Sequence, residues 1–209
     1  MPARNQDLHG SAPDQSSVAL LIIDLIGDFD FEGGEVLLEQ ALPAARAIHA
    51  LKARARKEGI PAIYVNDNYG RWQADLARLL ANATRPDSPG RELVELLIPD
   101  EADYFVLKPK HSAFYSTILD TLLDYLGART LIVTGIAADM CVLFSASDAY
   151  IRDFFVAVPE DCVASADPDN TRGALRLMHR VLKADTTSAA KLDLAALKRR
   201  GAGEGSSES

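Results

Sequence analysis

The chain has 209 residues, of which 48% are hydrophobic, and its 30 acidic and 22 basic side chains give a net charge of −8. This length is enough for one domain with a substantial core, and the negative charge disfavours nucleic acid or an anionic membrane as a partner. Two cysteines are too few for a disulfide framework. No apolar run approaches the ~20 residues that cross a bilayer, and the N-terminus does not resemble a signal peptide. We therefore expect a cytoplasmic protein whose partner is a small molecule or another protein.

Both ends of the chain have the composition of unstructured segments. Residues 1–16 show almost no apolar periodicity, and residues 201–209 are rich in Gly and Ser. Neither segment can bury enough apolar surface to offset the entropy lost on ordering. We therefore predict a single folded domain at residues 17–200 between two disordered tails.

Between these tails, short apolar runs alternate with segments of helical periodicity. Buried strands are predicted, in chain order, at Val18–Ile23, Ile60–Val65, Tyr104–Lys108, Leu131–Val133, Phe154–Val158 and Ala184–Thr186. Helices are predicted at Leu37–Glu58, in short pieces within Trp72–Leu97, at Phe114–Leu126, after Asp139, at Thr171–Leu182 and at Ala189–Arg199. The alternation indicates an α/β domain of three layers, α/β/α, around a doubly wound six-stranded parallel sheet of Rossmann-like type.

Chemically reactive side chains follow three of the predicted strands. The first strand leads into Asp24, the third ends at Lys108, and the fourth leads through a tight turn to Cys141 at the start of a helix. Parallel α/β sheets place their sites outside the carboxyl ends of the strands, so we expect a carboxylate, an ammonium group and a thiol to meet there. Unpaired N–H groups and the helix dipole would lower the pKa of Cys141, as a nucleophile requires.

Each of these residues also has a purely structural explanation. Asp24 can cap a turn, Lys108 can be a solvated loop residue, and Cys141 can be a small buried hydrophobe. The three residue types nevertheless occupy equivalent positions along the sheet, and together they are what the activation of a sulfur nucleophile needs. The combination favours a catalytic centre over three unrelated structural roles.

Three segments resemble the landmark sequences of the isochorismatase-like cysteine hydrolases, a superfamily that includes nicotinamidases, N-carbamoylsarcosine amidases and ureidoacrylate amidohydrolases. They are VALLIIDLIGDFDFEGG, VLKPKHSAFYSTILD and LIVTGIAADMCVLFSASDAYIRDFFVAVPEDCVAS. The resemblance runs in order from about Val18 to Thr187, and its most specific part is the G-I-A-x-D-x-C-V element. It implies the isochorismatase-like hydrolase fold, and homodimers or homotetramers.

The resemblance also assigns catalytic roles to Asp24, Lys108 and Cys141. It favours Lys108 over Lys110, because the lysine of this superfamily usually stands six residues before an aromatic residue, which is Phe114 here. Lys110 is then expected to be exposed.

A further implication of the resemblance concerns the backbone before the Cys141 helix. The superfamily has a non-proline cis peptide at this place, which corresponds to Ile136–Ala137. The N–H groups of Ala137 and Cys141 would then point at one spot and form an oxyanion hole.

These residues suit a hydrolase that cleaves a C–N bond of a small amide, ureido or carbamoyl compound through a thioester. Asp24 would take the thiol proton of Cys141, pass it to the leaving nitrogen and then activate water, while Lys108 would favour both anions. Two alternatives remain open. One is a vinyl-ether hydrolase of the isochorismatase type, although the presence of Cys141 favours C–N cleavage. The other is a catalytically idle binding module on the same fold.

The residues expected to bind substrate depart from the superfamily pattern. The Gln and Asn of D-x-Q-N-D-F are absent from the DLIGDF sequence at Asp24–Phe29, so two amides that could orient a substrate are missing. The candidate pocket residues are Phe29, Asn66, Trp72 and Phe114. Trp72 can either stack on a planar substrate or pack in the core.

Neither a metal nor a cofactor is predicted. The NDNYGRW stretch at residues 66–72 lacks the histidines of the Asp-and-His metal cluster that nicotinamidases share, which makes nicotinamide a less favoured substrate. His111 and His179 have no carboxylate or cysteine at ligand spacing, so we interpret both as ordinary surface or satisfied histidines. Gly33 and Gly34 lack the spacing of a nucleotide-binding loop. Cys162 is interpreted as a packing residue.

Overall fold

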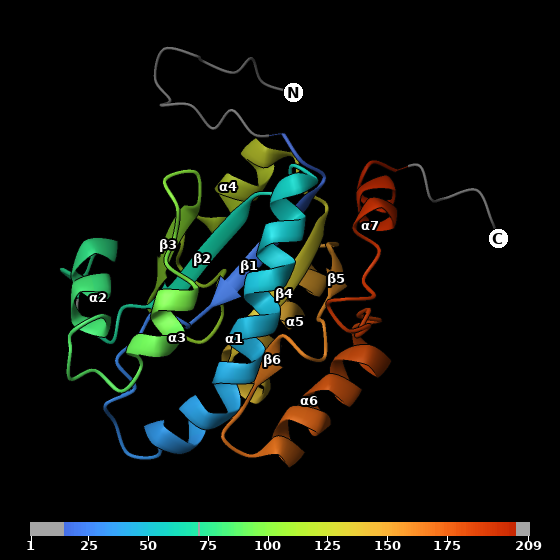
Figure 1. Cartoon of the computed structure of the whole chain (residues 1–209). Coiled ribbons are helices and arrows are strands. Elements are labelled where there is room, and N and C mark those ends of the chain that lie inside the picture. Colours follow the sequence, from blue (N-terminus) through green and yellow to red (C-terminus); the bar gives the residue numbers. More distant parts are fainter. Residues whose placement is uncertain (1–14, 71, 204–209) are drawn as a thin grey trace, which may run out of the picture.

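A computed structural model describes residues 15–70 and 72–203. The strands are β1 (Val18–Ile23), β2 (Ala62–Asp67), β3 (Tyr104–Lys108), β4 (Thr130–Ile136), β5 (Phe155–Ala157) and β6 (Val163–Ala164). They form one parallel sheet in the order β3-β2-β1-β4-β5, and β6 pairs with the end of β4 (Figure 1). The order reverses direction at β1, which confirms a doubly wound sheet of six strands.

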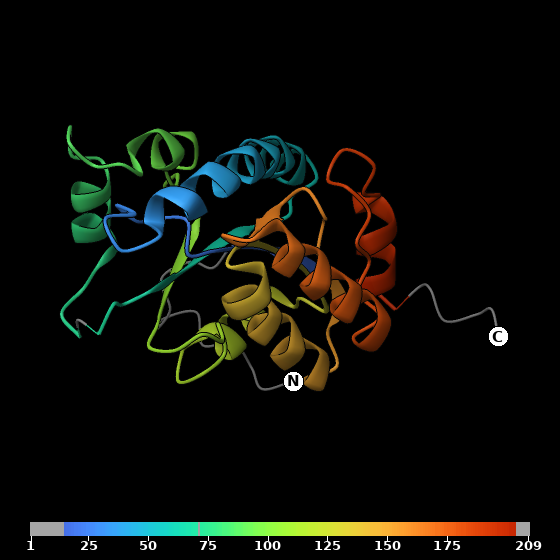
Figure 2. The ribbon, with the colours of Figure 1, turned by 90° about the horizontal axis from the view of Figure 1, so that it is seen from below.

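Helices cover both faces of this sheet. They are α1 (Gly34–Lys57), α2 (Leu76–Ala83), α3 (Arg91–Leu96), α4 (Leu119–Leu126), α5 (Leu143–Ile151), α6 (Pro168–Val181) and α7 (Leu194–Gly201), and a π-helical turn, η1 (Ala138–Val142), leads directly into α5. Side chains of α1, α3 and α7 share one core cluster, whereas those of α4, α5 and α6 share the other. Figures 1 and 2 show α1 and α5 on opposite sides of the sheet. The three-layer α/β/α architecture is therefore confirmed.

The apolar run of the central strand β1 is continuous because both faces of this strand are buried. All six of its residues are fully buried. Leu20 and Ile22 point into the α1 layer, whereas Leu21 and Ile23 point into the α5 layer, because successive strand side chains face opposite sides of the sheet. A strand buried on both faces cannot show polar alternation.

Several elements differ from the sequence predictions. The last helix, predicted at Ala189–Arg199, begins only at Leu194. The predicted helix at Phe114–Leu126 begins only at Leu119, because the preceding residues form a turn in which Thr117 Oγ1 donates to Ala113 O. The sixth strand is Val163–Ala164 and not Ala184–Thr186, where Asp185 forms a single bridge to Ala157. A strand of two residues is too short to produce a periodic signal, so its position could not be predicted from the sequence.

Ordered structure reaches slightly beyond the predicted boundaries at both ends. Ser16, which was assigned to the N-terminal tail, is buried, and its N–H donates to Leu126 O over 2.9 Å. Gly201 is the last residue of α7. The rest of the predicted tails, residues 1–14 and 204–209, lies outside the described residues.

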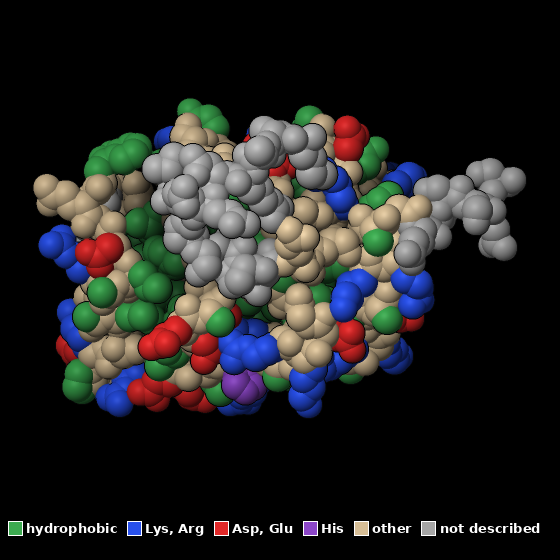
Figure 3. Space-filling view, turned by 90° about the horizontal axis from the view of Figure 1, so that it is seen from above, with side chains coloured by type: hydrophobic (Ala, Val, Ile, Leu, Met, Phe, Trp, Pro, Cys, Tyr) green, Lys and Arg blue, Asp and Glu red, His purple; other side chains and the backbone are tan. Residues whose placement is uncertain are grey.

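Figure 3 shows the face of the molecule on which β1 begins. Basic and acidic side chains are intermingled along the visible rim of this face (Figure 3). Within residues 15–70 and 72–203, no helix is both long enough and apolar enough to cross a membrane.

Gly135 occupies the closest approach between β4 and β1. Its φ is +114°, and a Cβ at this position would lie 2.1 Å from Ile23 O. Gly135→Ala is therefore expected to lower the free energy of unfolding by at least about 2 kcal/mol, because neither the backbone conformation nor the space accepts a side chain. Urea unfolding measures this loss.

The control is the same substitution in an ordinary helix. Gly173 lies within α6, and the nearest atom to its Cβ position is 3.9 Å away. Gly173→Ala is expected to stabilise the protein by about 0.5–1 kcal/mol. Equal effects of the two substitutions would contradict the close packing of β1 against β4.

Candidate active site

Asp24, Lys108 and Cys141 meet at the carboxyl edge of the sheet, where β1 and β4 lie side by side. Lys108 Nζ is 2.8 Å from Asp24 Oδ2 and donates to Cys141 Sγ over 3.4 Å, and Asp24 and Cys141 both line the cavity above this lysine. These contacts are one ion pair and one hydrogen bond, and Lys108 is the donor in both. The expected meeting of the three groups is therefore observed, while their catalytic roles remain a prediction.

The backbone around Asp24 fixes the direction of its carboxylate. Asp24 has a left-handed φ of 55°, and its N–H donates to Val65 O over 2.9 Å. The N–H of Asp67 donates to Asp24 Oδ1 over 2.7 Å, which leaves Oδ2 facing Lys108. Both oxygens are thus held by groups that favour the ionised carboxylate.

Lys108 is the last residue of β3, and its side chain is fully buried. The register of β2 and β3 places it beside Asp67, whose Oδ2 lies 3.5 Å from Nζ. Burial opposes the charge of Lys108, but the nearby Asp24, Cys141 and Asp67 outweigh burial and raise the pKa of Lys108 above its ordinary value. Lys108 is therefore a permanently charged ammonium group beneath the sulfur.

The protonation of Cys141 differs from the sequence prediction. Cys141 lies in η1, yet burial of the sulfur and the neighbouring Asp24 charge raise the pKa of Cys141 to about 12, although Lys108 lowers it. Burial also raises the pKa of Asp24 above its ordinary value, against the effect of Lys108. The expected lowering of the thiol pKa is wrong, because desolvation and a carboxylate outweigh the helix dipole. Cys141 is a thiol at neutral pH and needs a base in contact with it.

The peptide bond between Ile136 and Ala137 is cis, as the resemblance implies. The carbonyl of Ala137 accepts hydrogen bonds from Met140 and Val142 N–H over 3.0 and 3.1 Å, so it caps the η1 turn. Ala137 and Cys141 both line the cavity above the sulfur. Their roles in an oxyanion hole remain a prediction.

A cavity of about 290 Å³ opens over Cys141. Its wall is apolar at Phe29, Phe31, Leu37, Ile136 and Met140, and ionisable at Asp24, Asp67, Tyr69, His111 and Cys141. A small apolar cavity with a few convergent polar groups is typical of a small-molecule site.

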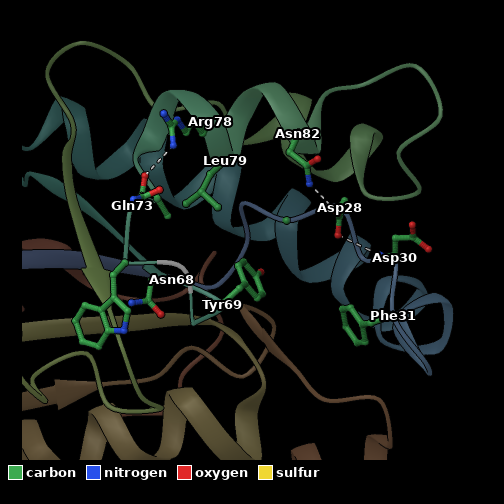
Figure 4. A pocket seen from close by; sticks show the side chains of 12 residues that line it. Asp28, Asp30, Phe31, Asn68, Tyr69, Gln73, Arg78, Leu79 and Asn82 are labelled. Atoms are coloured by element: carbon green, nitrogen blue, oxygen red, sulfur yellow. Dashed lines mark hydrogen bonds between the residues drawn. The ribbon is translucent and has the colours of Figure 1, made fainter.

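A second hollow of about 740 Å³ adjoins this cavity (Figure 4). The two share Gly27, Phe31 and Tyr69 as lining residues. In the larger hollow, Asn82 Nδ2 donates to Asp28 Oδ2 over 2.5 Å (Figure 4). The larger hollow therefore has a partly polar wall and borders the cavity that Cys141 lines.

The four candidate pocket residues divide into two pairs. Phe29 lines the cavity over Cys141, and Trp72, which is 82% exposed, lines the larger hollow and is not part of the core. Asn66 and Phe114 line neither space. Asn66 is fully buried and donates to Ile26 O over 2.8 Å, whereas Phe114 packs in the core cluster beneath α4 and α5. The prediction for Asn66 and Phe114 is therefore corrected: both support the fold around the site.

His111 is the site residue that the sequence analysis missed. It is exposed, as an ordinary surface or satisfied histidine is, but its Nδ1 lies 3.7 Å from Cys141 Sγ, so the sequence analysis did not place it at the site. A signal was available, because His111 stands three residues after Lys108 in a loop that leaves the carboxyl edge of the sheet. Lys110, by contrast, is exposed.

His179 and Cys162, the other residues discussed in the sequence analysis, lie outside the candidate site. His179 Nδ1 lies 3.2 Å from Ala184 O. Cys162 is fully buried in a core cluster, which confirms its interpretation as a packing residue. Across the described ranges, no group of three or more His, Cys, Asp or Glu side chains is placed to hold a metal ion. The expectation that catalysis needs no metal remains a prediction.

The doubly wound sheet and the polar centre at its switch point together define an enzyme of the α/β class. Comparison with known protein families identifies the family within this class. Residues 18–190 match the family described as the Isochorismatase domain. The chain belongs to this family of hydrolases.

Three similar proteins illustrate the range of the family. The isochorismatase family protein YaaI of Bacillus subtilis is 44% identical, over 81% of this chain and 93% of its own length. The ureidoacrylate amidohydrolase RutB of Methylorubrum extorquens is 29% identical, over 84% of this chain and 80% of its own. The crystal structure of the N-carbamoylsarcosine amidase of Thermoplasma acidophilum is 26% identical with a TM-score of 0.64, over 85% of this chain and 99% of its own.

Proposed function

We propose that the protein hydrolyses a C–N bond of a small amide, ureido or carbamoyl compound through a thioester on Cys141. The observation that carries this proposal is the placement of Lys108 Nζ in contact with both other groups, 3.4 Å from Cys141 Sγ and 2.8 Å from Asp24 Oδ2. The relatives named as a ureidoacrylate amidohydrolase and an N-carbamoylsarcosine amidase support the choice of a C–N bond.

The raised pKa of Cys141 determines how the first step proceeds. Because Cys141 is a thiol at rest, Asp24 takes its proton as the sulfur attacks the substrate carbonyl carbon. The positive charge of Lys108 offsets the thiolate and the carboxylate as they exchange the proton. The N–H groups of Ala137 and Cys141 stabilise the oxyanion.

Collapse of the intermediate completes the transfer to sulfur. The proton held by Asp24 moves to the leaving nitrogen, the C–N bond breaks, and ammonia or an amine departs. A thioester remains on Cys141, and water then hydrolyses it.

The two adjoining spaces match the two halves of such a substrate. The cavity of about 290 Å³ over Cys141 accommodates the reacting carbonyl and its nitrogen. The hollow of about 740 Å³ accommodates the rest of the molecule, with Tyr69 at the border of both spaces. Substrates that extend beyond a bare amide are therefore expected to bind better than acetamide or urea.

Product analysis on a panel of primary amides, ureides and carbamoyl amino acids tests this function. We expect ammonia release from at least one compound by the wild type, and none by Cys141→Ala. Isochorismate is included in the same panel. Pyruvate release from it that persists in Cys141→Ala would contradict C–N hydrolysis and indicate a vinyl-ether hydrolase. A wild type that releases neither product would indicate an idle binding module.

A further inference from the structure

His111 is held in place by the loop that connects β3 to α4. The residues that follow it are anchored to α5, because Ser112 Oγ is hydrogen-bonded to the Asp148 carboxylate and the Ala113 N–H donates to Ser145 Oγ over 2.9 Å. The imidazole ring also packs against Phe144, with 5.6 Å between the ring centroids. Three contacts with α5 therefore fix the position of His111 near the sulfur.

His111 lies on the solvent side of the sulfur, whereas Asp24 and Lys108 lie on its buried side. Its Nδ1 is 3.7 Å from Cys141 Sγ, and the residue is exposed. The Lys108 side chain is fully buried, and that of Asp24 is only 13% exposed. Cys141 thus has a buried acid–base partner and a solvent-accessible one.

The other ionisable groups around this cavity come from four elements. They are Asp24 after β1, Asp67 and Tyr69 at and after the end of β2, Lys108 on β3 and Cys141 on η1. Asp67 Oδ1 accepts the N–H of Tyr69 over 2.6 Å, and Oδ2 faces Lys108. Among the groups that line this cavity, His111 is the imidazole, a side chain that can accept a proton from water.

We propose that His111, and not Asp24 as the sequence analysis expects, is the general base of the hydrolytic half-reaction, which rests on the thioester of the proposed function. Asp24 transfers its proton to the leaving nitrogen and lies with Lys108 on the buried side of the sulfur. Water reaches the thioester from the solvent side, where His111 lies. An imidazole nitrogen this close to the sulfur is within one water molecule of a carbonyl carbon bonded to that sulfur.

The step balances with water as the only reagent. The water oxygen bonds to the thioester carbonyl carbon, and one water proton passes to His111. The C–S bond then breaks, its electron pair stays on sulfur, and the carboxylic or carbamic acid leaves. The proton on His111 returns to the Cys141 thiolate, which restores the thiol and the neutral imidazole.

His111→Gln tests the proposal with p-nitrophenyl acetate, which can acylate the sulfur whatever the natural substrate is. We expect a burst of about one equivalent of p-nitrophenolate at close to the wild-type rate. The steady-state rate should then fall by about 10²-fold or more, as for loss of a general base. The acetylated protein should accumulate in intact mass spectra, and a peptide map should place the acetyl group on Cys141.

The pH dependence of deacylation supplies a second readout. The wild-type rate is expected to fall as the pH is lowered through the range in which histidines titrate, about pH 5–8, because a protonated imidazole cannot accept a proton. His111→Gln should lack this fall. His49→Gln is the matched control, since His49 is exposed and its ring contacts Leu96 O outside the site; it should behave as the wild type does.

Three outcomes would overturn the role of His111. They are deacylation of His111→Gln at the wild-type rate, equal losses in the burst and steady-state rates, and an unchanged pH dependence. A burst that survives in Cys141→Ala has a different meaning, because it would remove the thioester itself and with it the proposed function.

Discussion

Replacement of Cys141 with alanine is expected to lower kcat for C–N hydrolysis by at least about 10⁴-fold, as the loss of a covalent nucleophile does in other hydrolases. The stability of the protein should change little, because Cys141 is only partly buried and alanine removes one sulfur atom from the edge of a cavity. Steady-state kinetics with a substrate identified by ammonia release measures the loss. Binding of that substrate to Cys141→Ala, followed by calorimetry, should remain detectable.

Cys162→Ala is the matched control for this variant. Both cysteines are free thiols, and burial raises the pKa of each. Cys162 lies in the core, so its loss should reduce stability modestly and leave kcat and KM close to the wild-type values. Comparable losses of kcat in the two variants would show that the effect comes from disturbed packing and not from a missing nucleophile.

Asp24→Asn is expected to change hydrolysis and thiol reactivity in opposite directions. Hydrolysis should fall by about 10²–10⁴-fold, because asparagine cannot accept the thiol proton. The Asp24 charge raises the pKa of Cys141, so its removal should lower that pKa and bring thiolate formation to lower pH. The rate of iodoacetamide alkylation as a function of pH should therefore shift to lower pH, while activity is lost.

Lys108→Met supplies the reciprocal test of these electrostatics. The ammonium group of Lys108 lowers the pKa of Cys141, so its removal should raise that pKa further and shift the alkylation profile to higher pH. Hydrolysis should fall in this variant too. A shift in the same direction for Asp24→Asn and Lys108→Met would contradict the arrangement of charges around the sulfur.

The central groups of the site were predictable because each stands where a buried strand ends. Asp24 follows a continuous apolar run, Lys108 closes another, and Cys141 follows the tight turn after a third. Parallel strands bring such ends to one edge, so position along the chain was sufficient to predict that these groups meet. The strand order, which brings β1 beside β4, comes from long-range packing and has no local signal.

The properties that depend on three-dimensional surroundings were harder to predict from the sequence. The pKa of Cys141 could not be predicted from its place near a helix start, because the outcome depends on how completely the sulfur is desolvated and on the distance to Asp24. The environments of Asn66 and Phe114 depend on which way their side chains face at strand ends and turns. His111 was interpreted as an ordinary surface or satisfied histidine because its partner, Cys141, lies 30 residues away in the sequence and not at ligand spacing.

Trapping of the covalent intermediate tests the central claim most directly. The wild-type protein is mixed with a substrate of the amide panel, quenched in acid and digested, and the peptides are analysed by mass spectrometry. The account predicts an acyl group on the peptide that contains Cys141, formed as ammonia is released and absent from Cys141→Ala. Release of ammonia at the wild-type rate by Cys141→Ala, or an acyl group found only at another residue, would contradict it.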